Sequence, residues 1–257
     1  MGAGGGRVGA DGSRAHGAAR SGVVWSVLGA ELDRRAAGGA VALDVLDLGG
    51  GSGVSAVPLG ELGHRVTVVD TSADALATLQ RRAADAGVAE RVTPVQGEVE
   101  RLPEAVAEAA YDLVLCHSLL EVVDDPAATL ATVAGALRPG GCASVLAAGR
   151  AAAVLARALG GHPADALRAL TDPAGRWGQA DGVLRRFDTD RLLELVTAAG
   201  LGVEAVHGVR VVADLVPGHV LDGEPGAADA LRQLEAAASE IPPYRDLAAQ
   251  LHVLARR

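Results

Sequence analysis

Short apolar runs alternate through the first part of the chain with stretches in which apolar side chains recur at three- and four-residue steps. The runs predict strands at residues 41–48, 65–70, 91–98, 111–118 and 142–149. The stepped stretches predict helices at residues 23–35, 54–63, 72–87 and 125–141. Because the apolar runs lack strict alternation and are interleaved with helices, the pattern indicates an α/β fold whose mostly parallel sheet has helices on both faces.

The regular rhythm ends at residue 149, where alanine-rich segments begin. We interpret residues 150–187 as an inserted helical cap, formed by two alanine-rich helices and an arginine-bearing loop. The pattern then predicts a helix at 188–200, strands within 201–215, a helix at 226–240 and a last strand at 250–257. Residues 1–15 are glycine-rich without an apolar core, so we expect a disordered tail there and a single domain over 16–257.

The charge balance of the chain bears on its partners. It contains no lysine and has a formal net charge of −9, so contact with nucleic acid would need a local basic patch. Cys116 and Cys142 lie in apolar strand runs and are expected to be buried free thiols of a cytoplasmic protein. No stretch reaches the roughly 18 uncharged apolar residues of a membrane helix, and the N-terminus lacks the apolar core of a secretory signal. We therefore expect no membrane span.

The segment VLDLGGGSGV, residues 45–54, places a glycine cluster directly after the first predicted strand. Its pattern, D-x-G-x-G-x-G, comprises Asp47, Gly49, Gly51 and Gly53, and Gly50 lies between the first two glycines as a further candidate for cofactor binding. A bare turn lets a ligand approach the backbone, and open α/β sheets bind ligands at the carboxyl ends of their strands. Asp70 ends the second predicted strand, where an acid reaches the ribose hydroxyls of an adenosine-type ligand.

Two cofactor classes use such a turn. Dinucleotides need the spacing G-x-G-x-x-G and place a pyrophosphate at a helix N-terminus. Here the glycines step by two, and Asp47, two residues before the first glycine of the motif, would repel a pyrophosphate. A carboxylate at this point suits a cofactor that carries an ammonium and a sulfonium group, which is S-adenosylmethionine.

Taken in order, the segments of this half of the chain resemble the class I S-adenosylmethionine-dependent methyltransferases. VLDLGGGSGV is similar to the first motif of that family, VTVVD to the second, VQGEVERLP to the third, YDLVLCHSLLEVVDDP to the fourth and LRPGG to the turn before the fifth strand. The resemblance covers about residues 40–149 and implies a Rossmann-like class I methyltransferase fold with a seven-stranded sheet. It also implies that Asp70 contacts the ribose, and that Glu98, where aspartate is commoner, and the Val99 amide face the adenine.

Further segments resemble one subfamily, the tRNA 5-carboxymethoxyuridine methyltransferases, which convert a wobble-base carboxylate to its methyl ester. They are LCHSLLEVVDDP, GVRVVADL and LRQLEAAASEIPPYRDLAAQLHVLAR, and with an arginine-led first helix they extend the resemblance from about Arg20 to the C-terminus. The resemblance implies that Arg20 binds the methionine carboxylate and that His117 lies beside the cofactor. The chain departs from the subfamily in its cap, where ALTDPAGRWGQADGVLRRF stands in place of a lysine-rich segment.

Methyl transfer from a sulfonium needs mainly alignment of the acceptor and exclusion of water, and a carboxylate acceptor is ionised without a general base. The sequence shows neither a Ser-His-Asp constellation nor metal-ligand spacing, so no metal is expected. The candidates for positioning the acceptor are His117, Arg210 and Tyr244. Arg210 either holds a carboxylate through paired hydrogen bonds or forms an internal salt bridge. Tyr244 and Trp177 either stack on a base or pack in the fold.

Other charged residues have two interpretations each. Glu121 either pairs with a neighbouring arginine or faces the pocket. Arg185 and Arg186 either contact a phosphate or form a solvated charge pair.

Three functions fit the sequence. The first is a cytoplasmic S-adenosylmethionine-dependent methyltransferase that esterifies the carboxylate of 5-carboxymethoxyuridine in tRNA. The second is a small-molecule methyltransferase for a carboxylic acid or natural product, favoured by the net charge of −9 and the missing lysines. The third is a non-catalytic nucleotide-binding protein on the same fold. The sequence assigns no oligomeric state.

Overall fold

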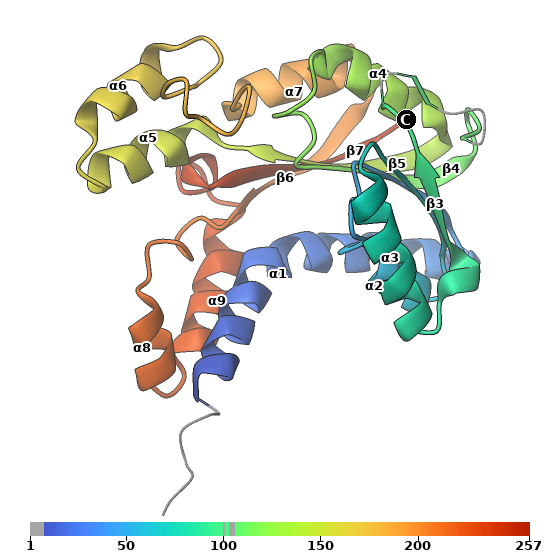
Figure 1. Cartoon of the computed structure of the whole chain (residues 1–257), viewed down its shortest axis with the longest axis horizontal. Coiled ribbons are helices and arrows are strands. Elements are labelled where there is room, and N and C mark those ends of the chain that lie inside the picture. The colour runs from blue at the N-terminus through green and yellow to red at the C-terminus, as the bar shows by residue number, and fades with distance from the viewer. Residues whose placement is uncertain (1–7, 100, 103–105) are drawn as a thin grey trace, which may run out of the picture.

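A seven-stranded sheet with the order β3-β2-β1-β4-β5-β7-β6 forms the centre of the molecule (Figure 1). The computed structural model describes residues 8–99, 101–102 and 106–257, with side chains from Gly22 onward apart from that of Asp222. The strands are β1 (Asp44–Leu48), β2 (Arg65–Asp70), β3 (Val92–Gln96), β4 (Tyr111–His117), β5 (Leu137–Ala148), β6 (Gly202–Val209) and β7 (Gln250–Arg256). β1 to β5 pair in parallel, and β7 runs antiparallel to β5 and β6. The predicted mostly parallel, seven-stranded α/β fold is confirmed.

Helices cover both faces of the sheet (Figure 1). On one face, α1 (Val8–Ala37), α2 (Ala56–Glu61) and α3 (Ala73–Asp85) enclose a buried cluster that includes Val45, Leu113 and Leu146. On the other face, α4 (Pro126–Ala136) and α7 (Thr189–Ala198) enclose a second cluster. The remaining helices are α5 (Arg150–Leu159), α6 (Pro163–Thr171), α8 (Gly218–Gly223) and α9 (Ala227–Ala238), with 3-10 turns at Ala89–Arg91 and Arg245–Leu247.

Local signals place the ends of the helices beside the glycine loop. The Ser72 hydroxyl accepts a hydrogen bond from the Ala75 N–H at 3.2 Å and caps α3, as predicted. Gly87 follows that helix with φ of +70°, a conformation that glycine adopts without steric cost. α2 begins only after Ser55, so Pro58 lies in its first turn, where the missing N–H costs least.

Predicted element bounds are wrong at residues 137–141 and 210–215. α4 ends at Ala136 rather than at 141, because Leu137 already pairs with Tyr111 and because Pro139 biases the preceding residue toward an extended backbone. Residues 210–215 form no strand, since the N–H groups of 211–213 donate to a glutamate of α9. Both partners lie far away in sequence, which local patterns do not reveal.

The N-terminal helix begins earlier than predicted. α1 starts at Val8, so residues 8–15 of the predicted tail are helical in the structure, and residues 1–7 lie outside the described residues. α1 contacts α8 and α9, which lie beside its N-terminal half in Figure 1. α8 and α9 come from the last part of the chain. Their contacts stabilise a helix that the glycine-rich sequence of residues 8–15 does not predict.

The cap leaves the sheet and returns to it at one point. Gly149 and Phe187 form a bridge, and the Arg150 N–H donates to the Phe187 carbonyl at 3.0 Å. The Phe187 N–H donates in turn to the Ala148 carbonyl at 2.8 Å. α5, α6 and the arginine-bearing loop therefore stand beside the carboxyl end of β5.

Cys116 and Cys142 are free and buried, as predicted. Among the described residues, no helix combines the length and the apolar character needed to cross a bilayer. The same part of the chain holds no cluster of three or more histidine, cysteine or acidic side chains that could bind a metal ion.

Candidate functional site

The glycine loop, residues 49–53, connects the carboxyl end of β1 to the turn before α2. Gly49, Gly51 and Gly53 all have φ between +52° and +77°, which side-chain-bearing residues rarely adopt. A Cβ on Gly53 would overlap with Cδ1 of the fully buried Leu79. The loop is bare because its turn needs positive φ and because packed side chains approach it closely.

Two carboxylates lie against this loop. Asp70 accepts the Gly51 N–H at 2.9 Å and the Ser72 N–H at 2.8 Å, so it ties the loop to the start of α3. Asp47 lies beneath the loop, and a Cβ on Gly50 would lie 2.5 Å from its carboxyl group.

Asp47 is the buried acid of the site. It is 3% exposed, and its Oδ2 atom has no hydrogen-bond partner within the described part of the chain. Burial, and secondly the charge of Asp70, raise the pKa of Asp47 to about 7. Because buried carboxylates are normally hydrogen-bonded or paired, this oxygen fits a ligand group that brings N–H donors and a positive charge.

The segment after β4 lies between the glycine loop and the cavity that Gln250 lines. A Cβ on Gly49 would meet the Leu119 side chain at 3.0 Å, and the Ser118 hydroxyl accepts a hydrogen bond from Gln250 Nε2 at 3.0 Å. His117 ends β4, and its Nε2 lies 2.8 Å from Ser144 Oγ. Burial lowers the pKa of His117 to about 4, so the ring is neutral at neutral pH.

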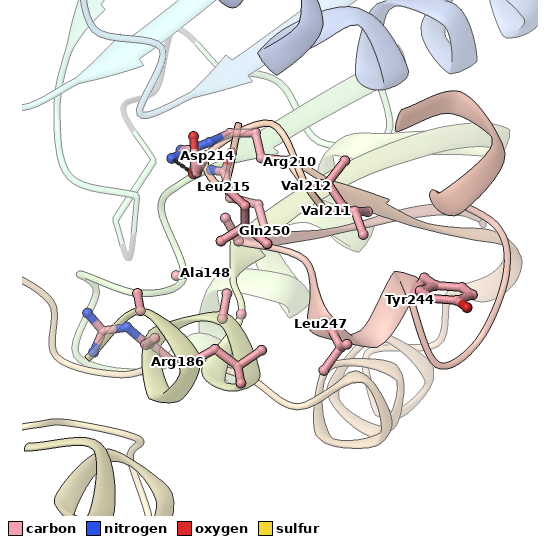
Figure 2. Close-up of a pocket in the computed structure, with 16 residues that line it drawn as sticks. Ala148, Arg186, Arg210, Val211, Val212, Asp214, Leu215, Tyr244, Leu247 and Gln250 are labelled. Atoms are coloured by element: carbon pink, nitrogen blue, oxygen red, sulfur yellow. Dashed lines mark hydrogen bonds and ion pairs between the residues drawn. The ribbon is translucent and has the colours of Figure 1, made fainter. Parts of the chain in front are cut away.

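A mostly apolar cavity of about 440 Å³ opens at the carboxyl ends of β5 and β6 (Figure 2). Its apolar wall includes Ala152, Leu155, Val211, Val212 and Leu247. Its polar groups come from Arg186, Arg210, Asp214, Tyr244 and Gln250. The structure therefore brings together Arg210 and Tyr244, two of the predicted positioning residues, whereas His117 connects to this cavity only through Ser118 and Gln250.

Arg210 pairs with Asp214 at the cavity wall, and its Nε is buried without a hydrogen-bond partner among the described residues. The predicted alternative of an internal salt bridge is thus present in the structure. Tyr244 is 55% exposed, so its ring remains accessible beside the cavity.

A buried glutamate shapes the turn that carries Arg210. Glu235 is 1% exposed, and its carboxylate accepts the N–H groups of Val211, Val212 and Ala213 at 3.0, 2.7 and 2.6 Å. Arg210 itself has φ of +59°, a conformation that persists only where the surroundings impose it. Sequence reasoning missed Glu235, although its place among the buried positions 231, 235 and 238 of α9 is a signal.

The cap binds the loop that follows β4. The Arg185 guanidinium donates to the carbonyls of Leu120, Val123 and Asp124, and the Leu184 N–H donates to the Glu121 carbonyl at 2.8 Å. Arg185 is therefore neither the solvated charge nor the phosphate contact that the sequence suggested. These bonds hold the cap over the candidate site.

Glu121 lies against the cap, and Arg186 belongs to the cap. Glu121 is 5% exposed, burial raises the pKa of its carboxyl, and its Oε2 has no hydrogen-bond partner within the residues described. Arg186 lines the cavity and pairs with Asp181 at 2.6 Å. Trp177 has the Arg157 guanidinium 3.7 Å from its ring centroid, so one face of the ring is covered within the protein.

The other predicted cofactor residues lie on separate segments. Arg20 lies in α1, and its side chain is outside the described residues. Glu98 is exposed and forms an isolated bridge with Arg101, whereas Val99 is 5% exposed and belongs to the core. Sequence reasoning did not identify Asp214 or Gln250, whose neighbours in the cavity come from distant segments.

The strand order and the antiparallel β7 are those of the class I S-adenosylmethionine-dependent methyltransferase fold, and the acid-led glycine loop and Asp70 lie at the ends of β1 and β2. Residues 45–141 match the family described as "Methyltransferase domain". Residues 45–141 are therefore similar to a methyltransferase domain, in agreement with the family resemblance of the sequence.

Curated relatives match less than half of the chain. The tRNA 5-carboxymethoxyuridine methyltransferase of Escherichia coli (strain K12) is 34% identical over 128 residues, which are 49% of this chain and 47% of that protein. The ubiquinone biosynthesis O-methyltransferase of Sodalis glossinidius is 38% identical over 104 residues, 40% of this chain and 41% of that protein. The matched segment thus spans about half the length of these relatives.

Solved structures extend the likeness of fold over most of the chain. An S-adenosylmethionine-dependent methyltransferase from Mesorhizobium loti matches with a TM-score of 0.56 at 21% identity, over 84% of this chain and 91% of that one. Geranyl diphosphate C-methyltransferase from Streptomyces coelicolor, in complex with Mg²⁺, geranyl diphosphate and S-adenosyl-L-homocysteine, matches with a TM-score of 0.54 at 15% identity, over 84% and 73%. At these identities the likeness concerns the fold.

Proposed function

We propose that this protein is a methyltransferase that binds S-adenosylmethionine over the glycine loop. The observation that carries the proposal is the buried oxygen of Asp47, which has no hydrogen-bond partner among the described residues and lies beneath a loop where Gly50 and Gly53 leave no room for a Cβ. This oxygen fits the ammonium group of the cofactor, and Asp70 fits its ribose hydroxyls. The bound cofactor supplies an activated methyl group, so the tasks of the protein are to orient the acceptor and to exclude water.

Further cofactor contacts follow from the motif positions. Gly49, Gly50, Gly51 and Gly53 let the cofactor approach the backbone. Glu98 and the Val99 amide are proposed to face the adenine, and Arg20 is proposed to bind the methionine carboxylate. His117 is proposed to lie beside the methionine end of the cofactor.

The proposed acceptor is a carboxylate, in first place that of 5-carboxymethoxyuridine in tRNA. Arg210 supports this, because it lines a cavity of about 440 Å³ and its buried Nε has no hydrogen-bond partner among the residues described. A substrate carboxylate would take two guanidinium N–H groups in place of Asp214. Since the carboxylate is ionised at neutral pH, no group of the protein needs to remove a proton. The name of the Escherichia coli relative supports the same acceptor.

The cap carries a local positive charge that favours a polyanionic acceptor. Residues 150–187 contain six arginines and three aspartates, whereas the whole chain has a net charge of −9. This surplus stands beside the cavity and would attract a phosphate backbone toward it.

Mass spectrometry of tRNA nucleosides from a deletion strain tests the tRNA assignment. We expect the methyl ester of 5-carboxymethoxyuridine to disappear and the free acid to accumulate, and persistence of the methyl ester refutes this acceptor. The purified protein with S-adenosylmethionine should restore the ester in tRNA from that strain.

Arg210→Ala tests the proposed carboxylate contact. We expect it to raise the acceptor KM by about tenfold or more, because a charge-assisted hydrogen bond contributes about 1.5–3 kcal/mol. Arg191→Ala is the matched control, since Arg191 is an exposed arginine of α7 that pairs with Glu194. Equal kinetics of the two variants would dismiss Arg210 as the carboxylate contact.

A small carboxylic acid or natural product is the second candidate acceptor. The mostly apolar wall of the cavity and the net charge of −9 favour it. The two acceptors differ in salt dependence, because tRNA binding releases counterions and weakens steeply between about 50 and 200 mM salt. A KM that hardly changes over this range would favour the small acid.

Titration calorimetry with S-adenosylhomocysteine separates both enzymes from a non-catalytic protein on this fold. An enzyme is expected to bind this product of the cofactor. Absence of binding would refute the methyltransferase proposal.

A further inference from the structure

A row of polar side chains crosses the sheet from the candidate site toward its far edge. It consists of His117 on β4, Ser144 on β5, His252 on β7 and His207 on β6, which are neighbouring strands. Each of the four lies two residues along its strand from a member of the buried cluster that α1, α2 and α3 enclose. These members are Leu115, Leu146, Leu254 and Val209, in the same order. Because alternate residues of a strand share a face, all four side chains lie on the face covered by α1.

The row is continuous. Ser144 Oγ lies 2.8 Å from His117 Nε2 and 2.8 Å from His252 Nε2. His252 Nδ1 lies 3.5 Å from His207 Nδ1. His207 Nε2 faces the carboxylate of the exposed Glu240 at 4.0 Å. Ser144 and His252 are fully buried and His207 is 7% exposed, so the two contacts of His252 are shielded from water.

The three rings are neutral at neutral pH. Burial lowers the pKa of His117 to about 4 and lowers the pKa values of His252 and His207 as well. A neutral imidazole has one N–H donor and one acceptor nitrogen, and a serine hydroxyl donates only one hydrogen bond. Ser144 Oγ has no other hydrogen-bond partner among the described residues, so its O–H must donate to one of the two rings, and the donors along the row then all point in one direction.

Glu240 determines that direction. Its charge acts on His207 more strongly than that of Arg245 and favours a proton on the Nε2 that faces it. His207 Nδ1 is then an acceptor, so His252 donates from Nδ1 and accepts at Nε2. Ser144 must donate to His252 and accept from His117 Nε2–H. The lone pair of His117 is left on Nδ1, which makes no hydrogen bond with another described residue.

We propose that Ser144, His252 and His207 are positioning residues that fix the His117 ring with Nδ1 as a hydrogen-bond acceptor for an N–H or O–H donor of the bound ligand. His117 ends β4 beside the glycine loop and next to Ser118, which Gln250 links to the cavity. The inference rests on the proposed function, because the donor comes either from the ammonium group of the cofactor or from a hydroxyl of the acceptor. It makes Ser144, remote from the ligand, a determinant of binding.

Nitrogen-15 NMR of the histidine rings in the ligand-free protein tests the positioning directly. In the wild type we expect the proton of His117 on Nε2 and that of His252 on Nδ1. Ser144→Ala removes the central hydroxyl with little change of volume and should leave both rings with mixed tautomers. His64, whose Nδ1 accepts the Leu43 N–H at 3.2 Å, is the internal reference and should not change.

The matched control is Thr129→Val, which removes another fully buried hydroxyl, that of α4. It should leave the tautomers of the row unchanged. A wild-type His117 with its proton on Nδ1, or tautomers that are the same in Ser144→Ala, would overturn the proposal.

Calorimetry and kinetics of Ser144→Ala identify the donor. If it is the cofactor ammonium, S-adenosylhomocysteine should bind about 2- to 10-fold more weakly, the effect of one hydrogen bond, while 5′-methylthioadenosine, which lacks the amino-acid part, binds as before. If it is the acceptor, both nucleosides bind unchanged and the acceptor KM rises by a similar factor. If Ser144→Ala changes neither of the two nucleoside affinities nor the acceptor KM, the positioning role is refuted. A wild type that binds neither nucleoside contradicts the proposed function instead.

Discussion

Replacing Asp47 by asparagine should stabilise the ligand-free protein at alkaline pH while it weakens cofactor binding. The pKa of Asp47 is raised from 3.8 to about 7 by burial and by the neighbouring charge of Asp70. Because a tenfold change in an ionisation constant corresponds to about 1.4 kcal/mol, ionisation of this buried group costs the folded state on the order of 4 kcal/mol above about pH 8. Asparagine has nearly the same shape without the charge, so Asp47→Asn should regain up to about that amount.

The stability difference between Asp47→Asn and the wild type should depend on pH in one direction. Because the folded-state pKa of Asp47 is raised, its favourable contribution is complete below about pH 4 and is lost as the pH rises through about 7. The stability advantage of Asp47→Asn should therefore be largest above about pH 8 and should shrink steadily toward about pH 4. Comparing variant and wild type at each pH cancels the titration of the other groups.

Urea unfolding between about pH 4 and 9 measures this difference, and titration calorimetry with S-adenosylhomocysteine measures the loss of affinity, expected to be at least about tenfold. Asp44→Asn on the same strand is the control with the opposite sign, because the hydrogen bond from Arg65 lowers the pKa of Asp44. That variant should lose stability at neutral pH, with the loss fading in acid. A stability difference for Asp47→Asn that does not depend on pH would refute the burial of an unpaired carboxylate.

Three other variants test separate parts of the site. Gly53→Ala should lower the urea midpoint and the affinity for S-adenosylhomocysteine, because φ of +77° and the adjoining Leu79 methyl exclude a Cβ. A variant that unfolds at the same urea concentration as the wild type would contradict this. Glu235→Gln should lower the free energy of unfolding by about 1–3 kcal/mol and raise the acceptor KM, since one amide oxygen cannot accept three N–H groups as well as a carboxylate. An unchanged KM would show that Glu235 does not influence acceptor binding in the cavity. Arg185→Ala should speed amide exchange at residues 120–124 with little effect on S-adenosylhomocysteine affinity, and unchanged exchange would show that the guanidinium does not hold this loop.

The sequence predicted elements well wherever the signal is local. β2 has the predicted bounds, and Ser72 and Gly87 mark the ends of α3 through contacts within a few residues. The sequence failed where a distant partner decides the backbone. Leu137 pairs with Tyr111 of β4, and the N–H groups of residues 211–213 bind Glu235. Local periodicity carries no information about such partners.

By itself, the sequence determined the chemistry of the cofactor end of the site. An acid two residues before a run of alternating glycines, and a second acid at the end of the next strand, define the turn, because spacing along the backbone fixes which groups can meet there. Only the tertiary structure decided the rest. It paired Arg210 with Asp214 at a cavity wall, held their turn on Glu235, and aligned histidines 117, 207 and 252 on one face. The physical reason is the strand order, since inserting the antiparallel β7 between β5 and β6 brings side chains more than a hundred residues apart into hydrogen-bond contact.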